Sequence, residues 1–240
     1  MAEYLIQSET LAGIADAIRG KTGGTDPVAV SDMAAQIEGI PAGGGGDIDA
    51  RIDGSITEIS SNVTDICGHA FYNCGQLKVA NFPMATRVRG QAFRYCSRME
   101  TVNFPAVTTI ESNAFQNCTS LSTVSFPAAT AIQSTSFSSC SSLQMADFPA
   151  ATSFSSSVFY GCTKLTALIL RSNTKPTLAN TSAFTETPIE SGTGYIYVPS
   201  ALIEDYKVAT NWSTYAAQFR ALEDYTVDGT VTGELDKTKI

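Results

Sequence analysis

Five of the six cysteines in this chain recur at a constant interval of 22 residues, and cysteine is its residue type best suited to chemistry. Thiolates act as nucleophiles, form disulfides and bind metal ions, but zinc and redox sites usually contain a Cys-x-x-Cys pair, which this sequence lacks. Each of the five lies three residues after a phenylalanine and three before a leucine or, at Cys96, a methionine, which predicts a column of small, buried, reduced thiols. The column comprises Cys74, Cys96, Cys118, Cys140 and Cys162, and Cys67 lies just before it.

The other residue types used in catalysis have no evident partners in the sequence. His69 is the single histidine, and it falls at the position that Gln91 and Asn113 occupy in later repeats, which predicts an exposed corner residue rather than a general base. Serines such as Ser139 and Ser141 have no evident base, and the acidic residues do not pair at a spacing typical of glycosidases. We therefore predict a protein that is not an enzyme, with no catalytic residues, no metal ion and no cofactor.

The cysteines belong to a longer repeated unit, A-F-x-x-C-x-x-L-x-x-V-x-F-P-x-x-T-x-I, which recurs between residues 70 and 170. Such a unit is too small to close a core alone and buries its apolar side chains against its neighbours, as in a solenoid. We predict an α+β repeat solenoid of about six coils, with a short strand at L-x-x-V-x-F and one or two helical turns at A-F-x-x-C-x-x-L. The predicted core columns are the cysteines above and Phe71, Phe93, Phe115, Phe137 and Phe159.

This unit resembles the BspA-like class of leucine-rich repeats, which is found in bacterial surface adhesins and in bacteriophage-encoded proteins. The resemblance covers roughly residues 56–221 and implies a leucine-rich repeat solenoid. Phe-Pro pairs such as Phe104-Pro105 stand where the family more often has Ile-Pro, which changes the volume of the core but not the architecture.

The N-terminal part, residues 1–40, is predicted to be a helical hairpin that serves as an anchoring module. Apolar residues follow Ser8 and Ser31 at helical spacing, and each serine can serve as an N-cap. The string YLIQSETLAGIADAIRGKTGGTDPVAVSDMAAQIEGI resembles a module of bacteriophage tail and structural proteins, which implies a virion or tail protein as its partner. A generic helical hairpin is the alternative. Residues 41–46 contain four consecutive glycines and are predicted to be a flexible linker.

The solenoid is predicted to occupy residues 47–182, and a C-terminal cap with a terminal hairpin residues 183–240. After residue 170 the period breaks, and Trp212, Tyr215 and Phe219 are spaced to cover the open end of the stack. The ending YVPSALIEDYKVATNWSTYAAQFRALED resembles that of BspA-like proteins. An Asp-Gly pair between two alternating runs predicts the hairpin over residues 225–232.

Charge is unevenly distributed along the chain. The net charge is −8, but residues 70–182 hold eight basic and three acidic residues. This local excess predicts attraction to an acidic partner, either an anionic glycan or a protein. The alternative is that these residues only make the outer face soluble, and nucleic-acid binding is disfavoured. The candidate ligand-binding residues are Lys78, Asn81, Arg87, Arg89, Arg94, Tyr95 and Arg98.

A second column consists of threonines one repeat apart. If these hydroxyls face outward they form a regular comb that could bind water or sugars, and if they face inward they bond to backbone corners. Strand propensity combined with hydrogen bonding at the corners is the simpler interpretation. The column is Thr64, Thr86, Thr108, Thr130 and Thr152.

These features support three functional hypotheses. The main one is a bacteriophage tail-associated or receptor-binding structural protein, in which the solenoid binds a bacterial surface glycan or protein. The alternative is a bacterial cell-surface adhesin or interaction protein of the BspA-like type, and the third, a polysaccharide-acting enzyme, would need a carboxylate cluster that the repeats lack. With no signal peptide or transmembrane segment visible, we expect a virion-associated or bacterial-surface location and no membrane insertion. The ligand, the viral or cellular origin and any homo-oligomer are left open.

Overall fold

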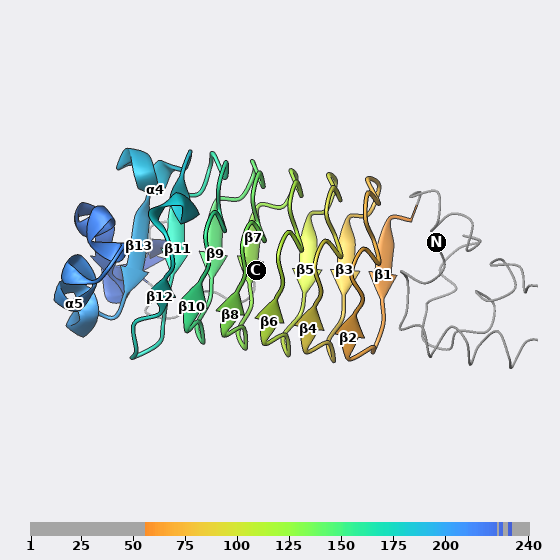
Figure 1. Cartoon of the computed structure of the whole chain (residues 1–240), viewed down its shortest axis with the longest axis horizontal. Helices are drawn as coiled ribbons and strands as arrows, with labels where there is room; N and C mark the ends of the chain where they lie inside the picture. Colours follow the sequence, from red (N-terminus) through yellow and green to blue (C-terminus); the bar gives the residue numbers. More distant parts are fainter. Residues whose placement is uncertain (1–55, 225, 228–229, 232–240) are drawn as a thin grey trace, which may run out of the picture.

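The computed structural model describes residues 56–224, 226–227 and 230–231, and these form a solenoid of parallel strands (Figure 1). The prediction of a leucine-rich repeat-like solenoid is confirmed by this architecture. The predicted helical hairpin at 1–40 and the glycine linker at 41–46 lie outside the described residues.

Each coil contributes one strand to each of two walls. The long-strand wall holds a sheet in the order β1-β3-β5 and then a sheet containing β7, β9, β11, β13 and β14, and the short-strand wall holds β2, β4, β6, β8, β10 and β12 in one sheet. All of these pairings are parallel, and equivalent residues of successive coils lie side by side, as Val79 does with Thr101. The bounds on the long-strand wall are β1 Glu58–Ser60, β3 Val79–Asn81, β5 Thr101–Asn103, β7 Thr123–Ser125, β9 Met145–Asp147, β11 Ala167–Ile169, β13 Tyr195–Val198 and β14 Phe219–Ala221. Those on the short-strand wall are β2 Asp65–Ile66, β4 Arg87–Val88, β6 Thr109–Ile110, β8 Ala131–Ile132, β10 Ser153–Phe154 and β12 Thr177–Leu178.

The third side of each coil, the turn wall, is formed by the A-F-x-x-C-x-x-L segments and contains turns, so the prediction of helical turns there is wrong. Within one coil, Gln91 and Tyr95 both adopt left-handed backbone conformations, with φ of 62° and 66°. The amide of Phe93 donates to the Ala114 carbonyl of the next coil at 2.8 Å, whereas the amide of Cys96 donates three residues back, to Phe93, at 3.2 Å. Helical turns would need every such amide to bond within its own segment, so bonding between coils excludes them.

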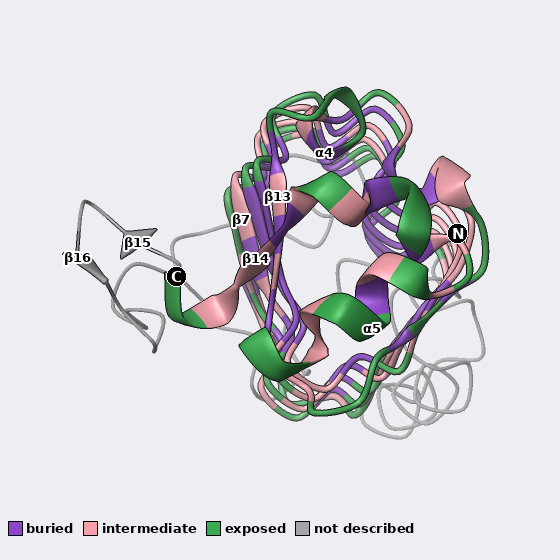
Figure 2. Cartoon of the chain, turned by 90° about the vertical axis from the view of Figure 1, so that its left-hand side faces the viewer, coloured by how far each residue is buried: buried purple, intermediate pink, exposed green. Residues whose placement is uncertain are grey.

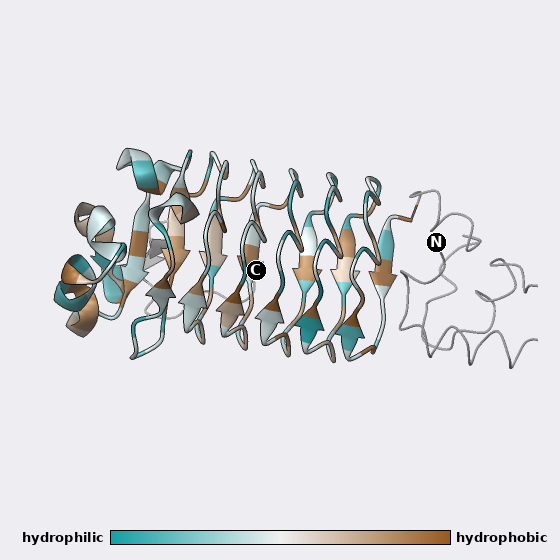
Figure 3. Ribbon diagram, in the orientation of Figure 1, coloured by the Kyte–Doolittle hydropathy of each residue, from teal (hydrophilic) through white to brown (hydrophobic). Residues whose placement is uncertain are grey.

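Two columns of phenylalanine rings run through the core. Rings within a column are stacked, as between Phe93 and Phe115, whose centroids lie 5.3 Å apart with an interplanar angle of 2°. Rings of different columns are tilted, as between Phe104 and Phe115 at 5.8 Å and 57°. In β1, β3, β5 and β7 a central apolar residue lies between more polar or more exposed neighbours, so the apolar side chain points inward (Figure 3). The buried rings are Phe71, Phe93, Phe115, Phe137, Phe159 in one column and Phe82, Phe104, Phe126, Phe148 in the other.

The cysteine column lies beside the phenylalanine rings and is buried and reduced. The thiol of Cys96 donates to the Phe71 carbonyl at 3.1 Å, and that of Cys118 to the Phe93 carbonyl at 3.3 Å, so each thiol is bonded to the backbone of the preceding coil. Burial raises the pKa of both thiols well above its ordinary value, which disfavours the reactive thiolate. The five buried thiols are Cys74, Cys96, Cys118, Cys140 and Cys162, and Cys67 is partly exposed.

Short helices lie across the C-terminal end of the stack (Figure 2). The Phe184 ring continues the phenylalanine column by stacking on Phe159 at 5.7 Å. Three side chains donate to carbonyls near the last coil: Asn211 to Leu178 at 2.7 Å, Trp212 to Pro176 at 2.7 Å and Tyr215 to Thr181 at 2.6 Å. These bonds satisfy backbone groups that no further coil pairs. The helices are η2 Thr181–Phe184, α4 Pro188–Ser191, η3 Ser200–Leu202, α5 Ile203–Val208, η4 Trp212–Gln218 and η5 Leu222–Asp224.

A second, smaller apolar cluster lies on the outer face of the long-strand wall. The outward residue that ends each strand is polar in β3, β5 and β7, but it is Ile169 in β11, with 0% of its surface exposed. Met145 and Ala167 are buried on the same face, and Tyr197 and Leu222 pack against them. The predicted terminal hairpin is present as β15 Thr226–Val227 paired antiparallel with β16 Thr230–Val231.

Replacing Phe115 with alanine should lower the free energy of unfolding by about 3–5 kcal/mol, because a fully buried ring with stacked neighbours on both sides leaves a cavity. Denaturant unfolding of the wild type and the variant measures the difference. Replacing the exposed residue Lys164 with alanine is the control and should change stability by less than about 0.5 kcal/mol. A near-neutral Phe115→Ala would contradict the stacked core.

Replacing Ser136 with alanine should raise the free energy of unfolding by about 1 kcal/mol. The Ser136 hydroxyl is buried with no hydrogen-bond partner among the described residues, and the equivalent residues of preceding coils are Ala92 and Ala114. The matched control is the reverse change, Ala114→Ser, which should cost a similar amount in the same unfolding measurement. Loss of stability in Ser136→Ala would mean that the hydroxyl has a partner.

Candidate functional site

The seven candidate ligand-binding residues come from two adjacent coils but lie on all three sides of the solenoid. The structure therefore does not gather them on one face. Lys78 and Asn81 lie on the long-strand wall, Arg87 and Arg89 lie in or directly after β4 on the short-strand wall, and Arg94, Tyr95 and Arg98 lie on the turn wall.

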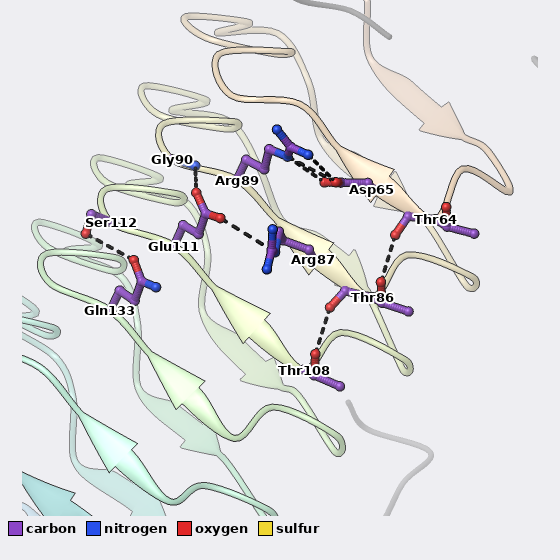
Figure 4. Close-up of polar contacts among 10 residues, drawn as sticks. All are labelled: Thr64, Asp65, Thr86, Arg87, Arg89, Gly90, Thr108, Glu111, Ser112 and Gln133. Carbon is purple, nitrogen blue, oxygen red and sulfur yellow. Dashed lines mark hydrogen bonds and ion pairs between the residues drawn. The ribbon is translucent and has the colours of Figure 1, made fainter. Parts of the chain in front are cut away.

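The two arginines at β4 are paired with carboxylates of neighbouring coils (Figure 4). Arg89 donates to both carboxylate oxygens of Asp65, with Nε at 3.0 Å from each and Nη2 at 2.6 Å from Oδ2. This hydrogen bonding raises the pKa of Arg89. Arg87 lies 3.6 Å from Glu111, whose other oxygen accepts the backbone amide of Gly90 at 3.0 Å. Little unneutralised charge remains on the short-strand wall of these coils.

The two candidates on the long-strand wall also have partners within the solenoid. The Lys78 ammonium lies 3.5 Å from the Glu100 carboxylate, across adjacent coils. Asn81 belongs to a ladder of polar side chains, since it donates to the Ser60 hydroxyl at 2.9 Å and accepts from the Asn103 amide at 2.7 Å. The side chains of Lys78 and Asn81 therefore both have partners in neighbouring coils, through an ion pair and hydrogen bonds respectively.

We call a set of four side chains on the turn wall the Tyr–Arg cluster. Tyr72 and Arg94 both contact Tyr95, and Arg98 follows Tyr95 by three residues in the same segment. Tyr72 is 43% exposed and Tyr95 is 37% exposed. Their ring centroids lie 5.7 Å apart, edge to face, and the Arg94 guanidinium lies 4.8 Å from the centroid of the Tyr95 ring. Tyrosine and arginine are the side chains most enriched at recognition surfaces, because they combine a large contact area with hydrogen-bonding groups.

The two arginines of the cluster bond to neutral groups. Arg94 donates to the Gln91 amide oxygen at 2.8 Å and to the Tyr95 hydroxyl at 3.2 Å, and Arg98 donates to the Gln76 amide oxygen at 2.6 Å. Residues 68–77 and 90–99, the turn-wall segments of these two coils, contain no aspartate or glutamate. In the part of the chain that the structure describes, the cluster therefore holds two positive charges without a carboxylate partner.

Tyr95 has a left-handed backbone conformation, which is unfavourable for tyrosine. The equivalent left-handed positions of other coils are occupied by Asn73, Asn117, Ser139 and Gly161, and asparagine and glycine tolerate this conformation best. A bulky aromatic residue at such a φ is uncommon, and strain of this kind concentrates at functional sites. The buried Nε of the adjacent arginine of the cluster also has no hydrogen-bond partner among the described residues. The backbone strain at Tyr95 and the unsatisfied Nε of Arg94 therefore both lower the stability of the folded state in this coil.

Sequence reasoning missed Tyr72, and coil geometry explains why. Tyr72 and Tyr95 are 23 residues apart, one more than the repeat, so they belong to different columns that become neighbours only when coils stack. The available signal was the variation at outward positions: where one coil has Arg94 and Tyr95, the following coil has Gln116 and Asn117. That contrast would have separated this coil from the rest.

The threonine column lies on the surface, and its hydroxyls are used within the solenoid. Thr86 donates to the Thr64 carbonyl at 3.1 Å and Thr108 to the Thr86 carbonyl at 3.1 Å, each one coil back (Figure 4). Thr130 and Thr152 repeat this bond at 3.2 and 3.0 Å. Because these four hydroxyls donate to the backbone, they support the corner-bonding interpretation.

The described ranges hold no group of three or more histidine, cysteine, aspartate and glutamate side chains arranged to bind a metal ion. Nor does any helix within them have the length and apolar character needed to cross a membrane.

Comparison with protein families and solved structures gives consistent results. Two overlapping spans, residues 54–166 and 86–202, match the model of the BspA type leucine rich repeat region with six copies, so more than half of the chain is covered. No curated protein matches the chain.

The similar solved structures are of bacterial proteins. A leucine rich cell surface protein from Faecalibacterium prausnitzii A2-165 is 32% identical, with a TM-score of 0.50 over 59% of this chain and 38% of its own. The pneumococcal vaccine antigen PcpA is 14% identical, with a TM-score of 0.53 over 68% of this chain and 39% of its own. A leucine-rich repeat protein from Bacteroides ovatus ATCC 8483 is 22% identical, with a TM-score of 0.47 over 60% of this chain and 43% of its own. The chain therefore spans well under two thirds of the length of each of these proteins.

Replacing Tyr95 with asparagine should raise the free energy of unfolding by about 0.5–1 kcal/mol, because asparagine tolerates the left-handed conformation at this position. Thermal and denaturant unfolding measure the effect. The reverse change at the equivalent position, Asn117→Tyr, is the control and should destabilise by a similar amount. If Tyr95→Asn lowers stability instead, the contacts of the Tyr95 ring outweigh the backbone strain.

Proposed function

The chain belongs to the BspA type leucine-rich repeat family, and on that premise we propose that it is a non-enzymatic recognition protein of the bacterial surface. It binds its partner, a surface glycan or protein, through the Tyr–Arg cluster of the turn wall. The observation that carries the proposal is the coincidence at one place of two exposed tyrosines, two arginines without carboxylate partners and a strained backbone.

The repeat architecture supports this function physically. The inward columns are fixed by packing, whereas outward positions of the turn wall differ from coil to coil without disturbing the core. One such column reads Gln76, Arg98, Ser120, Ser142, Lys164. A rigid frame that presents variable side chains is well suited to recognition.

Family membership and surface likeness favour an adhesin or interaction protein over the other hypotheses. The relative from Faecalibacterium prausnitzii is described as a cell surface protein. A role in a bacteriophage tail rests on residues 1–40, which lie outside the described part of the chain, and it stays a prediction. An enzyme acting on polysaccharides would need a pair of carboxylates over a bound sugar, whereas Asp65, Glu100 and Glu111 are each engaged by a basic side chain.

Binding of the fluorescently labelled full-length chain to a panel of bacterial strains tests the proposal. The wild type should bind some strains and not others. The double variant Arg94→Gln/Arg98→Gln should lose at least about tenfold in affinity, the usual cost of removing charged anchors from a recognition surface. The matched control Lys78→Gln/Arg87→Gln removes the same charge from ion-paired positions and should bind like the wild type. Equal loss of affinity in both variants would mean that binding depends on general electrostatic attraction and not on the cluster. Wild-type affinity in both variants would mean that the cluster is not the binding site.

A further inference from the structure

We propose that the ligand of the Tyr–Arg cluster is an acidic saccharide, one that carries a carboxylate or a sulfate on its sugar ring. This inference rests on the proposed function and narrows its partner to one chemical class. It is carried by the charge of the cluster, by its exposed rings and by the polar character of the surrounding surface.

The charge of the cluster requires an acidic ligand. Of the five basic candidates, Lys78, Arg87 and Arg89 face carboxylates at 3.5, 3.6 and 2.6 Å, whereas Arg94 and Arg98 bond to glutamine and tyrosine side chains. Neutral partners hold the guanidinium groups in place and leave their positive charge in full. A planar guanidinium matches a carboxylate or sulfate with two parallel hydrogen bonds.

The aromatic rings supply the contact that a sugar needs. One face of a pyranose ring carries mostly C–H groups and packs on a flat aromatic surface, while its hydroxyls reach polar groups at the edge. Tyr72 and Tyr95 are 43% and 37% exposed, so part of each side chain is open to such a contact. The Tyr95 hydroxyl accepts a hydrogen bond from the Arg94 guanidinium at 3.2 Å, which places a polar group beside the ring. Ring stacking and charge pairing are therefore available within the reach of one or two sugar units.

The surrounding surface does not favour a protein partner. A stable protein interface buries roughly 1,200–2,000 Å² around a desolvated apolar core. The exposed large hydrophobic side chains of the described residues are few, and beyond the cluster they lie at separate places. The next turn-wall segments carry amides and hydroxyls instead, as in residues 112–120 and 134–142. A narrow patch of aromatic, cationic and amide groups fits a saccharide better than a protein face.

Binding to matched pairs of oligosaccharides tests the inference. The full-length chain is titrated calorimetrically with sialyllactose and lactose, with trigalacturonic acid and its methyl ester, and with a sulfated disaccharide and its desulfated form. A hexaglutamate peptide is included as an acidic ligand without a sugar. We expect binding to at least one acidic saccharide, about tenfold or more loss for its neutral counterpart, and no comparable binding of the peptide.

Variants then assign the binding to the cluster. Arg94→Gln/Arg98→Gln should lower the affinity for the acidic saccharide by at least about tenfold. Tyr72→Ala should lower the affinity for the acidic and neutral forms alike, because it removes stacking rather than charge. The charge-matched control Lys78→Gln/Arg87→Gln should leave the affinity unchanged. Far-ultraviolet circular dichroism and thermal unfolding establish that each variant is folded, and Tyr95→Asn is a second cluster variant that is expected to be more stable than the wild type.

The outcomes separate this inference from the proposed function. If no acidic saccharide binds, but strain-selective cell binding persists and is lost in Arg94→Gln/Arg98→Gln, the inference is overturned and the recognition function stands. Comparable binding of hexaglutamate would also overturn it, in favour of an acidic peptide. If neither saccharides nor cells bind, both proposals fail.

Discussion

The structure depends on the stacking of phenylalanine rings between neighbouring coils. A coil of 22 residues cannot enclose a core of its own, so each ring is buried by the coils on either side. Phe115 shows this directly, since its centroid lies 5.3 Å from both Phe93 and Phe137. The parallel ladders of the two strand walls hold successive coils at about 4.8 Å, and this spacing brings the rings of one column into stacking contact.

The same stacking dictates the conformation of the turn wall. Its amides alternate between carbonyls of the next coil and carbonyls three residues back, and two left-handed residues per coil are needed to turn the chain between these partners. Most coils use asparagine, serine or glycine at the second of these positions. Tyr95 departs from this rule, so the fold carries backbone strain beside the exposed rings of the Tyr–Arg cluster.

On the outer surface, some basic side chains are neutralised by a carboxylate of an adjacent coil and others are not. Arg89 and Asp65 are 24 residues apart and meet on the short-strand wall, whereas Arg94 meets glutamine and tyrosine on the turn wall. Among the described residues of these two coils, the arginines of the turn wall are therefore the basic side chains that bond to neutral groups instead of carboxylates.

Periodicity alone was enough to predict the repeat solenoid and the central strands, because a column of identical residues leaves few ways to bury them. The BspA type came from the resemblance of the repeated unit to that family. The turn wall could not be predicted, since the three-residue spacing of A-F-x-x-C-x-x-L suits both a helical turn and a succession of β-turns, and hydrogen bonding between coils selects the latter. Stacking also decided which charges pair and which rings meet. Asp65 with Arg89, and Tyr72 with Tyr95, are offset from the repeat by one or two residues, so their contacts exist only once the register and path of successive coils are fixed.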